Sequence, residues 1–153
     1  MSFTITSPFF KEGEMIPALF TCDGEDHSPA LSWSAIPAGA ASFALICDDP
    51  DAPSGDWVHW VIYDLPPGAT ALPEKVPAAD RLEGGGVHGK NSWGRLGYGG
   101  PCPPGGIHRY FFKLYALDRT LGLDPGATKA DVLKAMKGHV VAEAQLMGRY
   151  KRR

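Results

Sequence analysis

Residues 42–53 read Ser-Phe-Ala-Leu-Ile-Cys-Asp-Asp-Pro-Asp-Ala-Pro, an apolar run that ends in three carboxylates and two prolines. The apolar part, Ser42 to Cys47, has the length and composition of a strand that is buried on both faces. Proline fixes its own φ angle and restricts the residue before it, so the acidic part is stiff. Ala52–Pro53 is also a candidate for a cis peptide bond. This stretch therefore predicts a central strand with a rigid acidic turn at its end.

Three other segments are rich in β-branched and aromatic residues and are also predicted to be strands. They run from Leu31 to Ile36, from Trp57 to Leu65 and from Arg109 to Leu117. Side chains alternate between the faces of a strand. In the second segment this places Trp57, His59, Val61 and Tyr63 on one face and Val58, Trp60 and Ile62 on the other. In the third it places Tyr110, Phe112, Leu114 and Ala116 on one face.

Helical character appears only near the C-terminus. Thr128 is suited to cap a helix over Lys129 to Lys137, with Asp131 as its capping-box partner and Gly138 as the stop. Val140 to Met147 is predicted to form a second short helix. The order of many strands followed by helices predicts a mostly β domain with short C-terminal helices.

Length and composition indicate one folded domain over residues 1–153, because the 19 glycines and 14 prolines accompany 16 aromatic residues. The net charge of −2 argues against a nucleic-acid binder. No apolar run is long enough to span a membrane, and no secretory signal is visible. The three cysteines form no CxxC pair and are odd in number, which predicts a reduced, cytoplasmic protein.

A second rigid segment, residues 98–106, reads Tyr-Gly-Gly-Pro-Cys-Pro-Pro-Gly-Gly and precedes a predicted strand. His108 and Tyr110 lie at the start of that strand with their side chains on one face. Together with Asp49 and His59, they would form a socket of imidazoles, a phenol and backbone N–H groups for a small anion. Each feature also has a purely structural explanation: a surface turn, a crossover loop, a half-buried aromatic residue or a core histidine.

Two motifs resemble those of the phosphatidylethanolamine-binding protein family. They are the run from Asp49 to Pro53 and the pairing of Gly100-Pro101 with His108-Arg109-Tyr110. The similarity is greatest to the bacterial and archaeal YbhB/YbcL-like branch, which includes Raf kinase inhibitor-like proteins. It extends over nearly the whole chain, through residues 21–24, 28–33, 89–91 and 99–104. Two departures are the short spacer before His59, relative to eukaryotic members, and Ala30 where a second proline is common.

The resemblance implies a β-sandwich with a large antiparallel central sheet, a smaller second sheet and a short C-terminal helical element. It also implies a pocket for phosphate-like and carboxylate-like groups, including the phosphatidylethanolamine head group. Carried over position by position, the pocket residues are Asp49, Asp51, Pro53, His59, Gly100, His108 and Tyr110. A homodimer is expected from the architecture of the branch.

These observations lead to three hypotheses about function. The first is a binding protein for a small anion or phosphorylated ligand, possessing no cofactor and no metal. The second is an interaction module that inhibits a kinase or a serine protease. The third is an acid–base hydrolase that uses Asp49 with His59 or His108. Because the sequence shows neither a nucleophile motif nor a metal motif, we expect binding and not catalysis.

Overall fold

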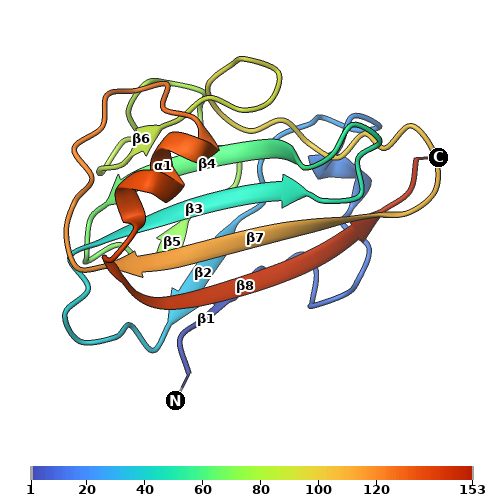
Figure 1. Ribbon diagram of the computed structural model, residues 1–153. Coiled ribbons are helices and arrows are strands. Elements are labelled where there is room, and N and C mark those ends of the chain that lie inside the picture. Colours follow the sequence, from blue (N-terminus) through green and yellow to red (C-terminus); the bar gives the residue numbers. More distant parts are fainter. Residues whose placement is uncertain (1, 153) are drawn as a thin grey trace.

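The computed structural model describes residues 2–152 and consists of two antiparallel sheets and one α-helix (Figure 1). The larger sheet has five strands in the order β6-β4-β3-β7-β8. These are β3 (Ser42–Asp49), β4 (Trp57–Leu65), β6 (Val87–His88), β7 (His108–Leu117) and β8 (Val140–Tyr150). The smaller sheet is β1-β2-β5, formed by β1 (Thr4–Thr6), β2 (Leu31–Ser34) and β5 (Ala71–Leu72). The helices are α1 (Lys129–Met136) and a 3₁₀ turn, η1 (Ala18–Phe20).

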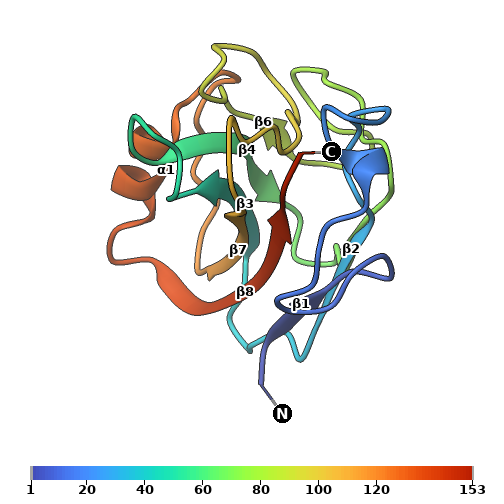
Figure 2. The same ribbon diagram turned by 90° about the vertical axis from the view of Figure 1, so that its right-hand side faces the viewer.

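The large sheet is covered on both faces. Figure 2 shows α1 on one side of it and strands β1 and β2 on the other. The side chains of β3 divide between the two interfaces: Phe43, Leu45 and Cys47 belong to the core between the sheets, and Ala44 and Ile46 pack in the cluster beneath α1. The prediction of a central strand buried on both faces is therefore confirmed, as is the mostly β sandwich.

Strand β4 contains an irregularity that changes which face His59 occupies. Cys47 pairs with Trp60, but the next residue of β3, Asp48, pairs with Val58, so His59 forms a β-bulge. As a result His59 contacts Tyr110, a residue of the core between the sheets, while Val61 packs beneath α1. The predicted alternation, with His59 and Val61 on one face, is wrong because the bulge shifts the register by one residue.

The segment after α1 is a strand and not a second helix. Residues 140–150 form β8, which pairs along its length with β7. Its residues Ala, Glu, Gln, Leu and Met favour a helix in isolation. Hydrogen bonding to β7 and the period-two burial of Ala142, Ala144 and Leu146 against the core outweigh that preference. Helix α1 itself begins as predicted, with a reciprocal capping box between Thr128 and Asp131.

The cysteine prediction is also wrong. Cys22 and Cys102 form a disulfide bond, and the third cysteine, Cys47, is a free thiol buried in the core. The two bonded cysteines are 80 residues apart, and their Cα atoms lie 5.4 Å from each other. Spacing along the chain could not reveal this contact, because folding brings the two segments together. The argument from cysteines for a cytoplasmic location is thereby removed.

Two further features concern the backbone. Residues 2–152 contain no cis peptide bond, so Ala52–Pro53 is trans. None of the helices in the same range has both the length and the apolar character of a membrane-spanning segment.

Candidate functional site

A cavity of about 310 Å³ lies where three neighbouring strands of the large sheet meet. Because β3 runs antiparallel to both β4 and β7, its C-terminal end lies beside their N-terminal ends. Asp49 ends β3, His59 lies near the start of β4, and His108 and Tyr110 begin β7. The topology of the sheet thus collects a carboxylate, two imidazoles and a phenol from three strands, and all four side chains line the cavity.

Asp49 and His108 form a buried pair on the cavity wall. The His108 Nδ1 donates a hydrogen bond of 2.7 Å to Asp49 Oδ2, and both side chains are less than a tenth exposed. The other carboxylate oxygen, Oδ1, accepts a hydrogen bond from the backbone N–H of Asp51. With both oxygens engaged, Asp49 holds the His108 ring in one orientation and leaves Nε2 as the nitrogen that can meet a ligand.

Asp51 holds the acidic turn against β7 and does not line the cavity. Its carboxylate accepts two hydrogen bonds from the Arg109 guanidinium and a third from the Arg109 backbone N–H. The hydrogen bonds from Arg109 lower the pKa of Asp51 to about 2. Because Arg109 directly follows His108, this ion pair links the acidic turn to the strand that carries the pocket histidine.

His59 is buried between two aromatic rings. Its ring contacts Trp93 and Tyr110 edge-to-face, with 5.1 Å between centroids in each case. The His59 Nδ1 lies 2.7 Å from the Gly99 carbonyl oxygen, an atom that can only accept a hydrogen bond. Nδ1 therefore carries the proton in the neutral ring. Burial lowers the pKa of His59, against the opposing effects of the Gly99 hydrogen bond and of Asp49, so the ring is neutral near pH 7.

The Tyr110 hydroxyl is the unsatisfied polar group of the site. Tyr110 is 1% exposed, and its hydroxyl has no hydrogen-bond partner at ordinary geometry within residues 2–152. Burial, and after it the charge of Asp49, raises the pKa of this phenol, so it remains a donor at neutral pH. A buried hydroxyl without a partner is costly unless something binds to it.

The remaining wall is mostly apolar and comes mainly from loops that the sequence analysis did not assign to the site. Pro53, which it did assign, lines the cavity together with further residues: Ala52, Ser54, Trp57, Trp93, Cys102, Pro103 and Pro104. The aromatic residues Trp57 and Trp93 contact each other edge-to-face at 5.5 Å between ring centroids. Trp93 carried no signal in the sequence, because it lies in the glycine-rich loop between β6 and β7 and meets His59 only in the folded chain.

Gly100 lies outside the cavity lining. Its backbone N–H donates a 2.7 Å hydrogen bond to Asp26 Oδ1, and an added Cβ would lie 2.3 Å from both that oxygen and the Phe20 carbonyl oxygen. The structure therefore gives Gly100 a packing role, in which it allows the loop after Tyr98 to approach the segment around η1. Its predicted contact with a ligand has no support in this geometry.

Within the described residues, the structure contains neither a cluster of metal-ligating side chains nor a basic side chain on the cavity wall. No cluster of three or more His, Cys, Asp or Glu side chains is arranged to hold a metal ion. No lysine or arginine side chain lines the cavity. An anion in this cavity would therefore interact with hydroxyl, imidazole and aromatic groups, and not with a permanent cation.

Comparison with known proteins gives consistent matches over the whole chain. The sequence pattern of the family described as phosphatidylethanolamine-binding protein matches residues 6–151. A UPF0098 protein of Methanothermobacter thermautotrophicus is 60% identical over 143 residues, covering 94% of this chain and 95% of the relative. A similar fold occurs in a putative phosphatidylethanolamine-binding protein homologue of Chlamydia trachomatis (TM-score 0.92, 41% identity, 99% of each chain). It also occurs in Escherichia coli YbcL (TM-score 0.90, 34% identity, 100% of each chain).

Proposed function

Because the chain belongs to the phosphatidylethanolamine-binding protein family, we propose that it binds a small phosphate-like anion in the cavity between β3, β4 and β7. The observation that carries this proposal is the Tyr110 hydroxyl, a buried donor without a hydrogen-bond partner on the wall of the cavity. An oxyanion oxygen would accept its hydrogen bond. The neighbouring His108 Nε2 can donate a second one when that ring is doubly protonated.

We propose binding and not turnover as the role of the cavity. Ser54 lines the cavity, but no hydrogen bond joins it to either histidine within residues 2–152. Cys102 is in a disulfide bond and has no thiol to react. An acid–base pair without an activated nucleophile matches recognition better than the nucleophilic mechanisms of hydrolases. The homodimer, the kinase or protease partner and the cytoplasmic location stay predictions.

The test is a titration with inorganic phosphate followed by NMR at pH 6.5, on the wild type and on Tyr110→Phe. We expect saturable shifts at His59, His108 and Tyr110 in the wild type. A hydrogen bond to a charged group contributes about 1.5–3 kcal/mol, so the variant should bind at least tenfold more weakly. His108→Ala should also lose most of the affinity.

Tyr115→Phe is the matched control, because it removes the same hydroxyl from the same strand on the face that packs beneath α1. It should bind phosphate as the wild type does. If the wild type shows no saturable shift at millimolar phosphate, the proposed function is wrong and the search should turn to protein partners.

A further inference from the structure

The direction of the hydrogen bonds at His59 limits which anions the cavity can accept. The Nδ1–H is committed to the Gly99 carbonyl oxygen, and the Gly99 N–H in turn donates to the His59 carbonyl oxygen. These reciprocal bonds hold the ring in place in the bulge of β4. In the neutral ring the remaining nitrogen, Nε2, is an acceptor and cannot donate.

The surroundings of His59 favour the neutral ring. It is 3% exposed and lies between the rings of Trp93 and Tyr110. The titratable groups around it are Asp48 and Asp49 at the end of β3, Asp56 before β4, and His108 and Tyr110 at the start of β7. The Asp49 charge is already engaged by His108 and by the Asp51 N–H, so no carboxylate is hydrogen-bonded to the His59 ring.

On this basis, and resting on the proposed function, we infer that the site selects tetrahedral oxyanions that carry a proton. A P–OH group would donate to His59 Nε2, while unprotonated oxygens accept from Tyr110 and, when its ring is doubly protonated, from His108. Inorganic phosphate carries such a proton at neutral pH, and a phosphomonoester carries one below its second pKa of about 6. Sulfate and phosphodiesters carry none. Phosphate and protonated phosphomonoesters would thus bind more tightly than the phosphodiester of an intact lipid head group.

The discriminating experiment compares two pairs of ligands on the wild-type protein at pH 6. The first pair is inorganic phosphate and sulfate. The second pair is phosphoethanolamine, a monoester, and glycerophosphoethanolamine, a diester with the same ammonium group. We expect the protonated ligand of each pair to bind at least tenfold more tightly. The unprotonated ligand would place an oxygen that carries no hydrogen against His59 Nε2, which carries none either. In His59→Gln an amide that can donate replaces Nε2, so the phosphate-to-sulfate ratio should fall.

Equal affinities within both pairs would overturn this inference, because they would show that a proton on the ligand does not strengthen binding. If none of the four ligands binds, the proposed anion-binding function is wrong, and not only the inferred selectivity. Monoester affinity should also rise as the pH falls from 7.5 to 5.5, while inorganic phosphate, protonated throughout, should change less.

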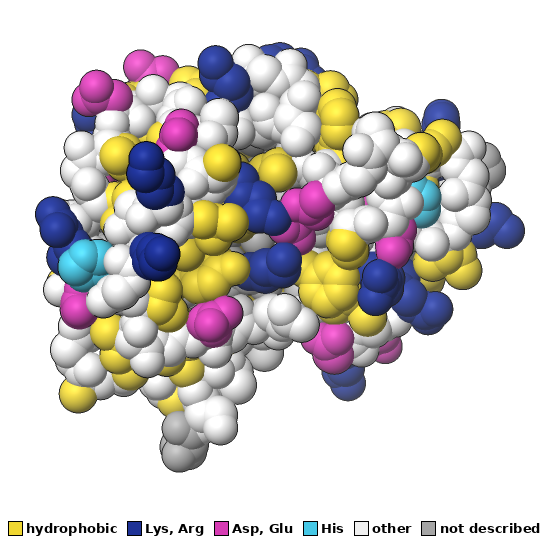
Figure 3. Space-filling model, in the orientation of Figure 1, with side chains coloured by type: hydrophobic (Ala, Val, Ile, Leu, Met, Phe, Trp, Pro, Cys, Tyr) yellow, Lys and Arg dark blue, Asp and Glu magenta, His cyan; other side chains and the backbone are white. Residues whose placement is uncertain are grey.

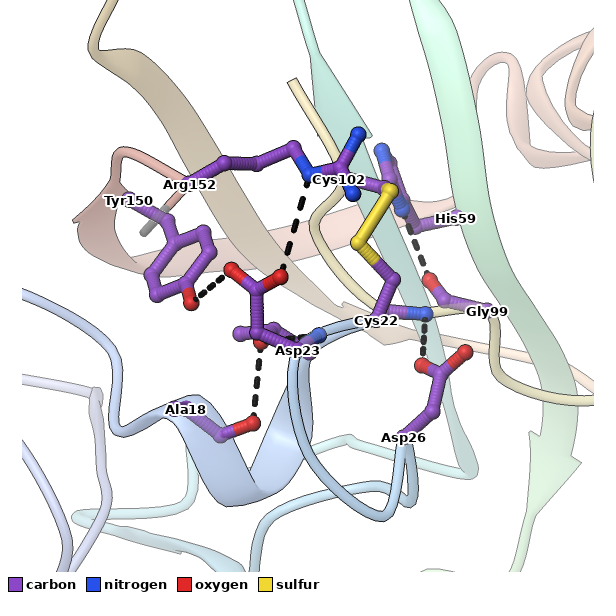
Figure 4. The surroundings of a disulfide bond; sticks show 11 residues. Ala18, Cys22, Asp23, Asp26, His59, Gly99, Cys102, Tyr150 and Arg152 are labelled. Carbon is purple, nitrogen blue, oxygen red and sulfur yellow. Dashed lines mark hydrogen bonds and ion pairs between the residues drawn. A yellow bond between two sulfur atoms is a disulfide. The ribbon is translucent and has the colours of Figure 1, made fainter. Parts of the chain in front are cut away.

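An independent observation concerns the disulfide, which forms part of the cavity wall. Cys102 is exposed and lines the cavity together with Pro103 and Pro104, and its partner Cys22 follows η1 (Figure 4). On one side of Cys102 the chain is well anchored. Gly100 N–H donates to Asp26 Oδ1, and Cys22 N–H donates to the Pro101 carbonyl oxygen. The bonded sulfurs thus stand at the boundary between an anchored loop and the cavity wall.

After Cys102, few interactions hold the cavity wall in place. Within the described residues, the stretch 103–106 makes no hydrogen bond, and an added Cβ at Gly105 or Gly106 would meet nothing within 4 Å. Pro103 is buried by packing, residues 104–107 are exposed, and regular hydrogen bonding resumes at His108, where β7 begins. The disulfide is therefore the cross-link that attaches the segment with Pro103 and Pro104 to the chain near η1.

We also propose that the Cys22–Cys102 bond is a thiol–disulfide exchange site whose reduction weakens anion binding in the cavity. A thiolate of a dithiol reductant attacks the exposed Cys102 sulfur, the S–S bond breaks, and Cys22 leaves as a thiolate and takes a proton. The second thiol of the reductant then attacks the mixed disulfide and releases Cys102. Two electrons and two protons pass to the protein, and the reductant becomes a disulfide. This proposal, too, rests on the proposed function.

The test is phosphate affinity in oxidised and dithiothreitol-reduced protein, with free thiols counted under native conditions. If the released wall occupies its binding position a tenth of the time, the apparent dissociation constant rises about tenfold. The double variant Cys22→Ser, Cys102→Ser should bind as weakly as reduced protein, with or without dithiothreitol. Val132→Ala, which loosens the core beneath α1 away from the cavity, should keep the oxidised affinity.

Unchanged affinity in reduced, folded protein would overturn this proposal. So would cysteines that dithiothreitol leaves bonded under native conditions. Absence of phosphate binding in the oxidised protein would instead overturn the proposed function on which it rests.

Discussion

Each pocket histidine uses one ring nitrogen for orientation and keeps the other for the cavity. The orienting group is the Asp49 carboxylate for His108 and the Gly99 carbonyl for His59. A carboxylate can stabilise a doubly protonated ring, whereas a carbonyl buried among aromatic rings supports a neutral one. The two imidazoles therefore differ in function although both come from strands of the same sheet. One is a potential donor to an anion, and the other is an acceptor.

Asp51 stabilises the acidic turn in a pH-dependent way. Because its hydrogen bonds with Arg109 lower the pKa of Asp51 to about 2, from an ordinary value of 3.8, the contribution is fully present above about pH 4. It is lost as the pH falls toward 2. We expect Asp51→Asn to be less stable than the wild type at pH 7, with a difference that shrinks between pH 4 and pH 2. Urea unfolding across this range measures it, and a difference independent of pH would contradict the assignment.

Gly100 should affect folding more than ligand binding. In Gly100→Ala the new Cβ meets the Phe20 carbonyl oxygen and Asp26 Oδ1 at 2.3 Å, so the backbone must move. Overpacking of this kind costs about 1–3 kcal/mol of unfolding free energy, which urea unfolding would reveal. Gly105→Ala, in the same loop but in open space, is the matched control and should be nearly neutral. Equal stability of both variants would contradict the packing role.

At the scale of single elements, irregularities of the large sheet determine what the site contains. The bulge in β4 turns His59 toward Tyr110, and without it the regular alternation would direct that ring toward α1. Strand β7 shows the opposite case. Its alternation is regular, and Tyr110, Phe112, Leu114 and Ala116 all enter the core as predicted.

The outer face of the sheet carries a second charged group that is separate from the cavity. Asp48 is fully buried beneath α1, and its Oδ2 accepts hydrogen bonds from Lys113 and Lys129. Lys129 also pairs with Asp56, so these charges link β3, β7, the turn before β4 and the first residue of α1. In Figure 3 basic and acidic side chains meet beside apolar ones on this face. These ion pairs help to fix α1 on the sheet.

The start of α1 is stabilised by a capping box between Thr128 and Asp131. Thr128 accepts from the Asp131 N–H, and the Asp131 carboxylate accepts from the Thr128 N–H. Thr128→Ala removes one half of this capping box and should lower the free energy of unfolding by about 1 kcal/mol. Thr128→Ser, which keeps the hydroxyl, should lose much less. Urea unfolding of both variants is the measurement, and identical losses would show that the hydroxyl is not the cause.

For the whole molecule, the disulfide is the one covalent link between distant segments in the described chain. It joins the segment after η1 to the loop before β7 across 80 residues. Closing so long a loop restricts the unfolded chain, and removal of such a bond typically costs about 2–4 kcal/mol.

We therefore expect the free energy of unfolding to fall by this amount when the protein is reduced, as measured by urea unfolding with and without dithiothreitol. The double variant Cys22→Ser, Cys102→Ser should show the same loss and no response to the reductant. A wild type whose stability does not respond to reduction would mean that the unfolded chain is not restricted by the bond.

Strands β3, β4 and β7, the start of α1 and the two rigid segments beside the site could be predicted from the sequence. These features depend on local physics: apolar runs, side-chain alternation, capping and the stiffness of proline. The family resemblance added the architecture and the list of candidate residues. Five of those residues, Asp49, Pro53, His59, His108 and Tyr110, do line one cavity.

The other features of the fold and the site depend on contacts that form only in the folded chain. Helix-favouring residues 140–150 became a strand because β7 offers a long partner, and Cys22 found Cys102 because the chain folds back on itself. Trp93 reached His59 from a loop, and a one-residue bulge decided the face of His59. All of these depend on contacts between residues far apart in sequence, whose energies exceed local preferences but leave no pattern within a short window of the chain.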